Sequence, residues 1–165
     1  MVPPIPAQQH QWLQQLVGEW TMEMEADMGP GEPLAKHKGT EIVRPLGDVW
    51  VVCEGTGDNP AGDPNGEPHR SVMSLGFDPN TNRFIGTFMS SMSTHLWIYN
   101  GQLDAAGKML TLDTEGPSFS QEEKMCRYQD SIIIKSPNER LLTSKCETAT
   151  GVWQDIMAAT YRRKK

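Results

Sequence analysis

The sequence predicts an all-β fold, an up-and-down antiparallel barrel of about ten strands preceded by one short helix. Two observations lead to this prediction. Short segments of alternating apolar and polar residues follow one another along the 165 residues, and turns rich in Gly, Pro and Asn separate them. No helical pattern long enough for a crossover between parallel strands interrupts the series. Because so many antiparallel strands cannot stay flat, we expect them to close into a barrel, with a two-sheet sandwich as the alternative.

The only helical pattern covers residues 7–17. Trp12, Leu13, Leu16 and Val17 form one apolar stripe there, and Gly18 supplies the permissive backbone at which a helix ends. Residues 1–7 carry three prolines and are expected to form an irregular arm.

The alternating segments place the strands. They cover residues 20–25, 39–46, 49–56, 70–77, 83–89, 94–99, 109–114, 124–135, 141–147 and 152–161. Residues 57–68 and 115–120 are expected to be loops, residues 78–82 a hairpin turn with Pro79 at its second position, and Asn100-Gly101 another turn. We expect residues 1–165 to form a single domain with one core.

The composition argues against several classes of protein. The formal net charge of −6 is unlike that of a nucleic-acid-binding protein, which needs a basic face. No apolar run approaches the ~18 residues of a membrane span, and the proline-rich start does not resemble a secretory signal. Cys53, Cys126 and Cys146 are odd in number and far apart, so we expect reduced thiols in a cytoplasmic protein. We expect neither a metal nor a cofactor.

The first predicted strand opens with Gly18-Glu19-Trp20, which is similar to the Gly-x-Trp signature of lipocalins and their calycin relatives. This resemblance implies that Trp20 packs at the closed end of a barrel. It also implies that an arginine from the end of the last strand lies across the indole. The matching position here is Arg162 or, failing that, Arg163.

Most of the chain resembles a bacterial domain-of-unknown-function family, number 1579, which is assigned a lipocalin-like barrel. The matching segments are residues 16–20, 39–47, 75–79, 84–87, 90–97 and 115–118. The resemblance supports the barrel and implies no particular activity.

Three charged residues lie within predicted strands. Glu41, Glu54 and Arg127 would form a carboxylate–guanidinium network able to hold a ligand head group if they faced the barrel interior. The alternative is that they face solvent, because a shift of one residue in register reverses every face.

His95 follows a run of small polar residues and precedes Trp97 and Tyr99. Histidine suits proton transfer near neutral pH, but it serves equally as a hydrogen-bonded wall residue near a barrel mouth. No pair of histidines has metal-ligand spacing, and no nucleophile or phosphate-loop motif is present.

We therefore expect a protein that binds a small, partly hydrophobic ligand with an anionic or hydrogen-bonding end in its barrel. The residues expected to contact this ligand are Glu41, Glu54, His95, Trp97, Tyr99, Arg127 and Trp153. One alternative is an enzyme that uses His95 with Glu54 or Glu41 for acid–base chemistry. Another is a structural module, such as a homodimer formed through a sheet face or the loop at residues 58–68.

Overall fold

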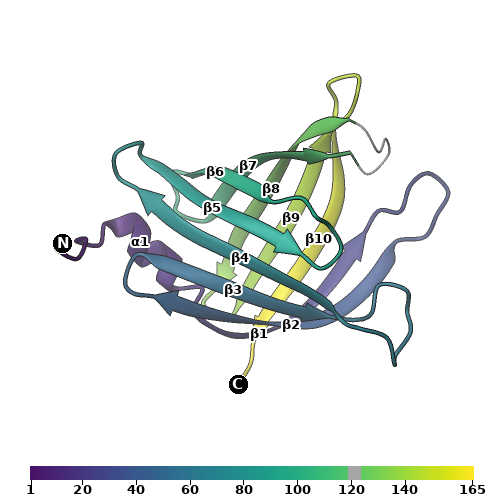
Figure 1. Cartoon of the computed structure of the whole chain (residues 1–165), viewed down its shortest axis with the longest axis horizontal. Helices are drawn as coiled ribbons and strands as arrows, with labels where there is room; N and C mark the ends of the chain where they lie inside the picture. The colour runs from purple at the N-terminus through teal and green to yellow at the C-terminus, as the bar shows by residue number, and fades with distance from the viewer. Residues whose placement is uncertain (119–123) are drawn as a thin grey trace.

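A computed structural model describes residues 1–118 and 124–165 and shows a closed barrel of ten antiparallel strands with one short helix (Figure 1). The predicted all-β barrel is therefore confirmed. The elements are α1 (Gln8–Gln14), β1 (Gly18–Ala26), β2 (Ala35–Leu46), β3 (Trp50–Gly57), β4 (His69–Asp78), β5 (Arg83–Ser90), β6 (Trp97–Leu103), β7 (Met109–Pro117), β8 (Met125–Ser136), β9 (Glu139–Glu147) and β10 (Trp153–Arg163).

The topology is a meander that closes on itself. Each strand pairs with its neighbours in sequence, and β10 returns to pair with β1. In this last seam Met22 lies opposite Tyr161 and Trp20 lies opposite Arg163. Among the strands of the described residues, closure leaves no free edge, which removes the main aggregation risk of an antiparallel sheet.

The register decides which side chains face the interior, because residues directly opposite one another share a face of the sheet. Cys53 lies opposite Val43 on β2 and Met73 on β4, and all three are buried. Trp20, buried as well, lies opposite Glu41. The inward face therefore includes Glu41 and Cys53, and their immediate neighbours along each strand point outward.

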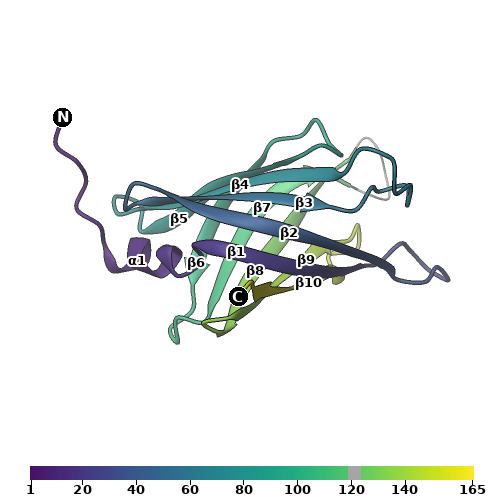
Figure 2. The ribbon, with the colours of Figure 1, turned by 90° about the horizontal axis from the view of Figure 1, so that it is seen from below.

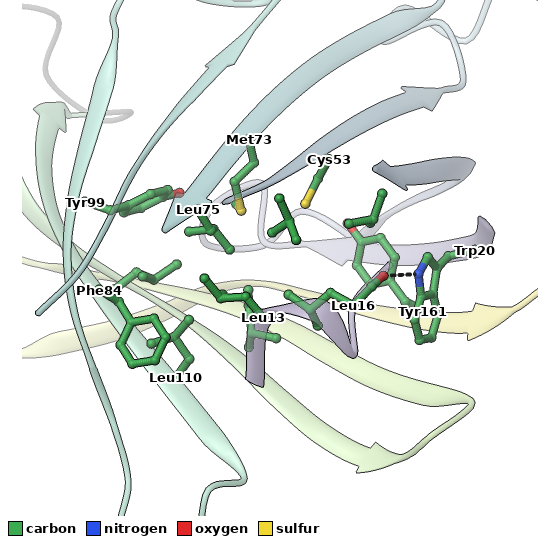
Figure 3. Packing of buried hydrophobic residues seen from close by; sticks show 14 of the residues in the cluster. Leu13, Leu16, Trp20, Cys53, Met73, Leu75, Phe84, Tyr99, Leu110 and Tyr161 are labelled. Carbon is green, nitrogen blue, oxygen red and sulfur yellow. Dashed lines mark hydrogen bonds between the residues drawn. The ribbon is translucent and has the colours of Figure 1, made fainter. Parts of the chain in front are cut away.

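Helix α1 closes one end of the barrel (Figures 1 and 2). Leu13 and Leu16 are 0% and 1% exposed, and Figure 3 shows them among the inward-facing side chains. Two hydrogen bonds attach the helix to loops and strand ends: His10 Nε2 lies 2.9 Å from the Phe77 carbonyl oxygen, and Trp12 Nε1 donates to the Gly107 carbonyl over 2.8 Å. The apolar stripe predicted for this helix is thus the face that closes the barrel.

Several predicted boundaries were wrong. The helix is shorter than residues 7–17, and β2 begins at Ala35 rather than at residue 39. Strand β6 begins at Trp97 rather than at residue 94 and continues through Asn100-Gly101, which was predicted to be a turn. A Cβ on Gly101 would lie 2.7 Å from Leu112 Cδ2, so this glycine serves close strand packing instead.

Strand β7 extends through Pro117, into the segment predicted as a loop at residues 115–120, and residues 119–120 lie outside the described residues. Strand β8 begins at Met125, one residue after the predicted start. Among the described residues, no helix combines the length and the apolar character needed to cross a membrane.

Candidate functional site

The barrel interior differs between its two ends. Near α1, inward-facing side chains such as Val51, Leu75 and Phe84 are almost completely buried. Toward the opposite end, large inward-facing side chains are only half-buried, although the closed sheet surrounds them. They are Met22, Met24, Phe88, Trp97, Leu142 and Met157. The interior is therefore packed at the α1 end and accessible from the other.

A buried ion pair lies inside the barrel near Trp20. The Arg140 guanidinium pairs with the Glu41 carboxylate, and the two side chains are 4% and 12% exposed. The guanidinium carbon of Arg140 lies 4.8 Å from the centre of the Trp20 ring and 4.0 Å from that of Tyr161. These contacts neutralise the Arg140 guanidinium and place it against two aromatic rings.

Two further ionisable groups surround this pair. Burial, reinforced by the charge of Glu41, raises the pKa of the Cys53 thiol and of the Tyr161 hydroxyl far above their ordinary values. Both groups are therefore neutral at physiological pH. Cys53 in this setting is a small packing residue rather than a thiolate nucleophile.

Arg163, and not Arg162, lies across Trp20. Its guanidinium carbon is 4.2 Å from the indole centre, and it donates hydrogen bonds to the carbonyls of Val17 and Gln15 over 2.7 and 3.0 Å. The choice of Arg162 was wrong because Arg163 is the residue opposite Trp20, so its neighbour points to the outer wall.

Gly18 makes this contact possible. Its φ of +142° is unfavourable for other residues, and a Cβ there would overlap Nη1 of Arg163. The glycine of the Gly-x-Trp motif thus leaves room for the arginine, while the tryptophan supplies the surface that the arginine covers. The Trp20 indole also donates to the Leu16 carbonyl over 2.9 Å, which links it to the turn after α1 (Figure 3).

A second polar cluster lies on the wall formed by β6 to β9, with side chains from β6, β8 and β9. The Tyr99 hydroxyl donates to Oδ2 of Asp130 over 2.5 Å, and the Ser144 hydroxyl hydrogen-bonds to the same carboxyl group. Burial raises the pKa of Asp130, and the two hydroxyls partly oppose this effect. Burial and the nearby Asp130 raise the pKa of Tyr99 as well.

Two of the predicted site residues lie on the outer wall. Glu54 faces outward and pairs with Arg44 at 3.3 Å. Arg127 is exposed and forms two hydrogen bonds with the Glu147 carboxylate, over 2.6 and 2.8 Å. The solvent-facing alternative therefore holds for both residues, and their expected contact with an interior ligand was wrong. Each is adjacent in its strand to an inward-facing residue, Cys53 for Glu54 and Tyr128 for Arg127, so each points outward.

Trp153 also lies outside the barrel, with the Arg127 guanidinium carbon 5.7 Å from its ring centre. It shares a groove of about 820 Å³ on the outer wall with Arg127 and with His95, which comes from the loop before β6. The predicted site residues therefore do not form one site. Glu41, Trp97 and Tyr99 face the interior, whereas His95, Arg127 and Trp153 share this groove. Glu54 lies apart from both, paired with Arg44 on the outer wall.

His95 fills a gap in the wall between β6 and β7. Pairing of these strands extends only from Leu103–Leu110 to Asn100–Asp113. Beyond it, His95 Nε2 lies 3.0 Å from the Glu115 carbonyl oxygen. The His95 ring packs edge-on against Trp97 at 4.9 Å, and Trp97 packs in the same way against Tyr128 at 5.0 Å.

The proposed acid–base pair is not assembled. The His95 ring hydrogen-bonds to a backbone carbonyl, whereas the carboxylate of Glu41 pairs with Arg140 and that of Glu54 with Arg44. Within residues 1–118 and 124–165, no group of three or more His, Cys, Asp or Glu side chains is arranged to hold a metal ion.

A protein-family model described as "Protein of unknown function (DUF1579)" matches residues 5–163 of the chain. The chain belongs to the DUF1579 family. A search of curated proteins finds no match.

Two solved structures resemble this DUF1579 protein over nearly its whole length. Rv2717c from M. tuberculosis is 15% identical and has a TM-score of 0.65, with 98% of this chain and 100% of that chain covered. The S-type phycobiliprotein lyase CPES from Guillardia theta is 15% identical and has a TM-score of 0.60, with 94% and 92% covered. At this level of identity the likeness establishes a shared fold.

Two polar residues in the interior of this DUF1579 barrel, Arg140 and Asp130, were not predicted from the sequence. The strand predicted at residues 141–147 excludes Arg140, but Arg140 belongs to β9 and alternates with the inward-facing Leu142 and Ser144. Asp130 alternates in the same way with the buried Tyr128 and Ile132. This alternation is the feature of the sequence that could have identified Arg140 and Asp130 as inward-facing.

Proposed function

We propose that the barrel interior binds a small, partly hydrophobic molecule that enters at the end opposite α1. The observation that carries this proposal is the incomplete burial of inward-facing side chains in that half of the barrel. Because backbone and outer side chains cover these residues from outside, their accessible surface faces the interior. Apolar surface left in such a place is available to a ligand.

The residues of this half suit a flexible apolar ligand. Met22, Met24 and Met157 contribute thioether side chains that adapt to irregular shapes. Gly55 and Gly57 on β3 face the same interior and add no side chain to it. Contact with such walls stabilises a ligand by about 25 cal/mol per Å² of apolar area removed from water.

A fluorescence titration with N-phenyl-1-naphthylamine, a neutral dye that brightens in apolar surroundings, tests this proposal. The wild-type protein is expected to bind the dye saturably. Met24→Trp should fill part of the interior and weaken binding at least tenfold. The control, Glu25→Trp, places the same side chain on the outer face of β1 and should leave binding unchanged.

Either of two results would contradict the proposal. The first is dye binding that does not saturate, which would indicate nonspecific adsorption. The second is equal loss of affinity in both tryptophan variants, which would place the dye outside the barrel. Far-UV circular dichroism of each variant verifies that the barrel is intact.

A further inference from the structure

The charges of the interior limit the ligands it can accept, an inference that rests on the proposed binding function. Arg140 is already neutralised by Glu41 at the packed end. Arg127, which was expected to receive an anionic head group, lies on the outer wall. Neither arginine is therefore free to receive an anionic ligand inside the barrel. His69 lies opposite the inward-facing Gly57, but burial and the nearby His37 lower its pKa and so disfavour its positive charge.

Asp130 is the carboxylate that remains. Its inward orientation follows from the register, since it lies opposite Leu112 on β7 and Ser144 on β9, both of which are buried. Asp130 itself is only half-buried. Because its neighbours cover it from the outer side, the accessible part of this residue faces the barrel interior.

Asp130 has hydroxyl partners but no cation. Tyr99 and Ser144 hydrogen-bond to it, whereas no lysine, arginine or histidine in the described part of the chain forms an ion pair with it. A carboxylate held away from water in this way is costly unless a positive charge approaches it. The site is thus electrostatically incomplete.

A second observation lies beside it. Thr114 is 7% exposed, and its hydroxyl has no hydrogen-bond partner among the described residues. Thr114 lies opposite Tyr128, and Asp130 lies opposite Leu112, so Thr114 and Asp130 are diagonal neighbours on the same inward face. A threonine hydroxyl can accept a hydrogen bond from the same donor group that pairs with a nearby carboxylate.

We propose that the barrel selects hydrophobic molecules that carry a cationic amine, with the ammonium group paired to Asp130 and the apolar part against the methionine-rich wall. The ammonium group supplies both the positive charge and the hydrogen-bond donors that this wall lacks. A neutral or anionic molecule of the same length makes the same apolar contacts without this pairing.

Competition against N-phenyl-1-naphthylamine tests the proposal with three probes of one chain length: decylamine, decanol and decanoate, each below its micellar concentration. In the wild-type protein decylamine is expected to displace the dye at a concentration at least tenfold lower than decanol, and decanoate should be the weakest. Asp130→Asn should remove the advantage of the amine. The matched control is Asp113→Asn, which alters an exposed, outward-facing aspartate on β7 and should keep it.

Each other outcome overturns the proposal. If decanol or decanoate displaces the dye as readily as decylamine from the wild-type protein, the interior binds ligands but does not select a cation. This ranking needs no variant, so it is informative even if Asp130→Asn fails to fold. If the amine keeps its advantage in folded Asp130→Asn, its charge is recognised elsewhere. If neither the dye nor any probe binds, the proposed function fails together with the inference.

Discussion

The guanidinium carbon of Arg140 lies 4.0 Å from the centre of the Tyr161 ring, and the same guanidinium forms an ion pair with Glu41 in the barrel interior. One side chain thus joins β2, β9 and β10. Because both charges are almost completely removed from solvent, each depends on the other for its stability.

Arg140→Met is expected to lower the free energy of unfolding by about 3–5 kcal/mol, because it leaves the Glu41 charge buried without a partner. Adding Glu41→Gln should recover much of this loss. Urea denaturation measures both effects. Arg44→Met is the control, because its pair with Glu54 is exposed and should contribute less than about 1 kcal/mol. Equal losses for Arg140→Met and Arg44→Met would contradict the prediction.

Arg163→Ala and Arg162→Ala should differ although the residues are adjacent. Arg163 contacts Trp20 and donates to three backbone carbonyls, those of Gln15, Val17 and Pro137. Its loss is expected to cost about 2–3 kcal/mol of unfolding free energy. Arg162 forms exposed ion pairs, and its loss should cost less than about 1 kcal/mol. Thermal denaturation of both variants makes the comparison, and similar melting temperatures would show that the contact with Trp20 contributes little.

Gly86→Ala should be much more harmful than Gly57→Ala. A Cβ on Gly86 would overlap the backbone carbonyl oxygen of Ser74, which can move only by displacing β4. We expect a loss of about 1–3 kcal/mol, as for other overpacked sites. A Cβ on Gly57 would meet its nearest atom, the Lys38 carbonyl oxygen, at an ordinary 3.5 Å. Chemical denaturation should therefore show a change within about 1 kcal/mol for Gly57→Ala, and a larger effect there than at Gly86 would be inconsistent with this packing.

Asp130 should make the protein less stable as the pH rises. Burial raises its pKa above the ordinary value of 3.8, so the folded protein keeps this proton to a higher pH than the unfolded chain does. The resulting stabilisation is fully present below pH 3.8 and is lost as the pH rises through the raised pKa. The unfolding free energy of wild type minus that of Asp130→Asn should therefore fall as the pH rises above 3.8. A difference that stays constant or increases as the pH rises would contradict the assignment.

The three cysteines should react with iodoacetamide at different rates. Cys53 is buried and its pKa is strongly raised, so it should stay unmodified until the protein unfolds. Cys126 and Cys146 are half-buried on the inward face and should react in the native protein. Peptide mass spectrometry over a time course distinguishes them. Modification of Cys53 at the rate of the other two would show that the packed end opens readily.

The alternation of apolar and polar residues was sufficient to predict the barrel and the number of strands. It failed where one residue type serves two structural purposes. Asn100-Gly101 has the composition of a tight turn, yet Gly101 lies inside β6 because its strand packs closely against Leu112. Only the neighbouring strand distinguishes these two uses of glycine.

The candidate site was predicted only in part, because the outer wall of this barrel also carries large apolar side chains. Glu54 shares its face of β3 with the large apolar side chain of Trp50. Trp50 nevertheless covers Gly76 from outside, where a Cβ on the glycine would overlap the indole. Arg127 likewise shares its face of β8 with Met125, which is exposed. Register depends on contacts between strands, which composition along one strand does not reveal.

The gap that His95 and Trp97 fill makes the barrel mechanically uneven. With four residue pairs, β6 and β7 share the shortest ladder of the closed sheet. Separating the segment before Asn100 from β7 would break aromatic contacts and the hydrogen bond between the His95 ring and the Glu115 carbonyl oxygen. Separating β7 from β8 would instead break pairing along nine residues. Under stress or thermal motion the cylinder should therefore part first along this line, close to its open end and beside the wall that carries Asp130.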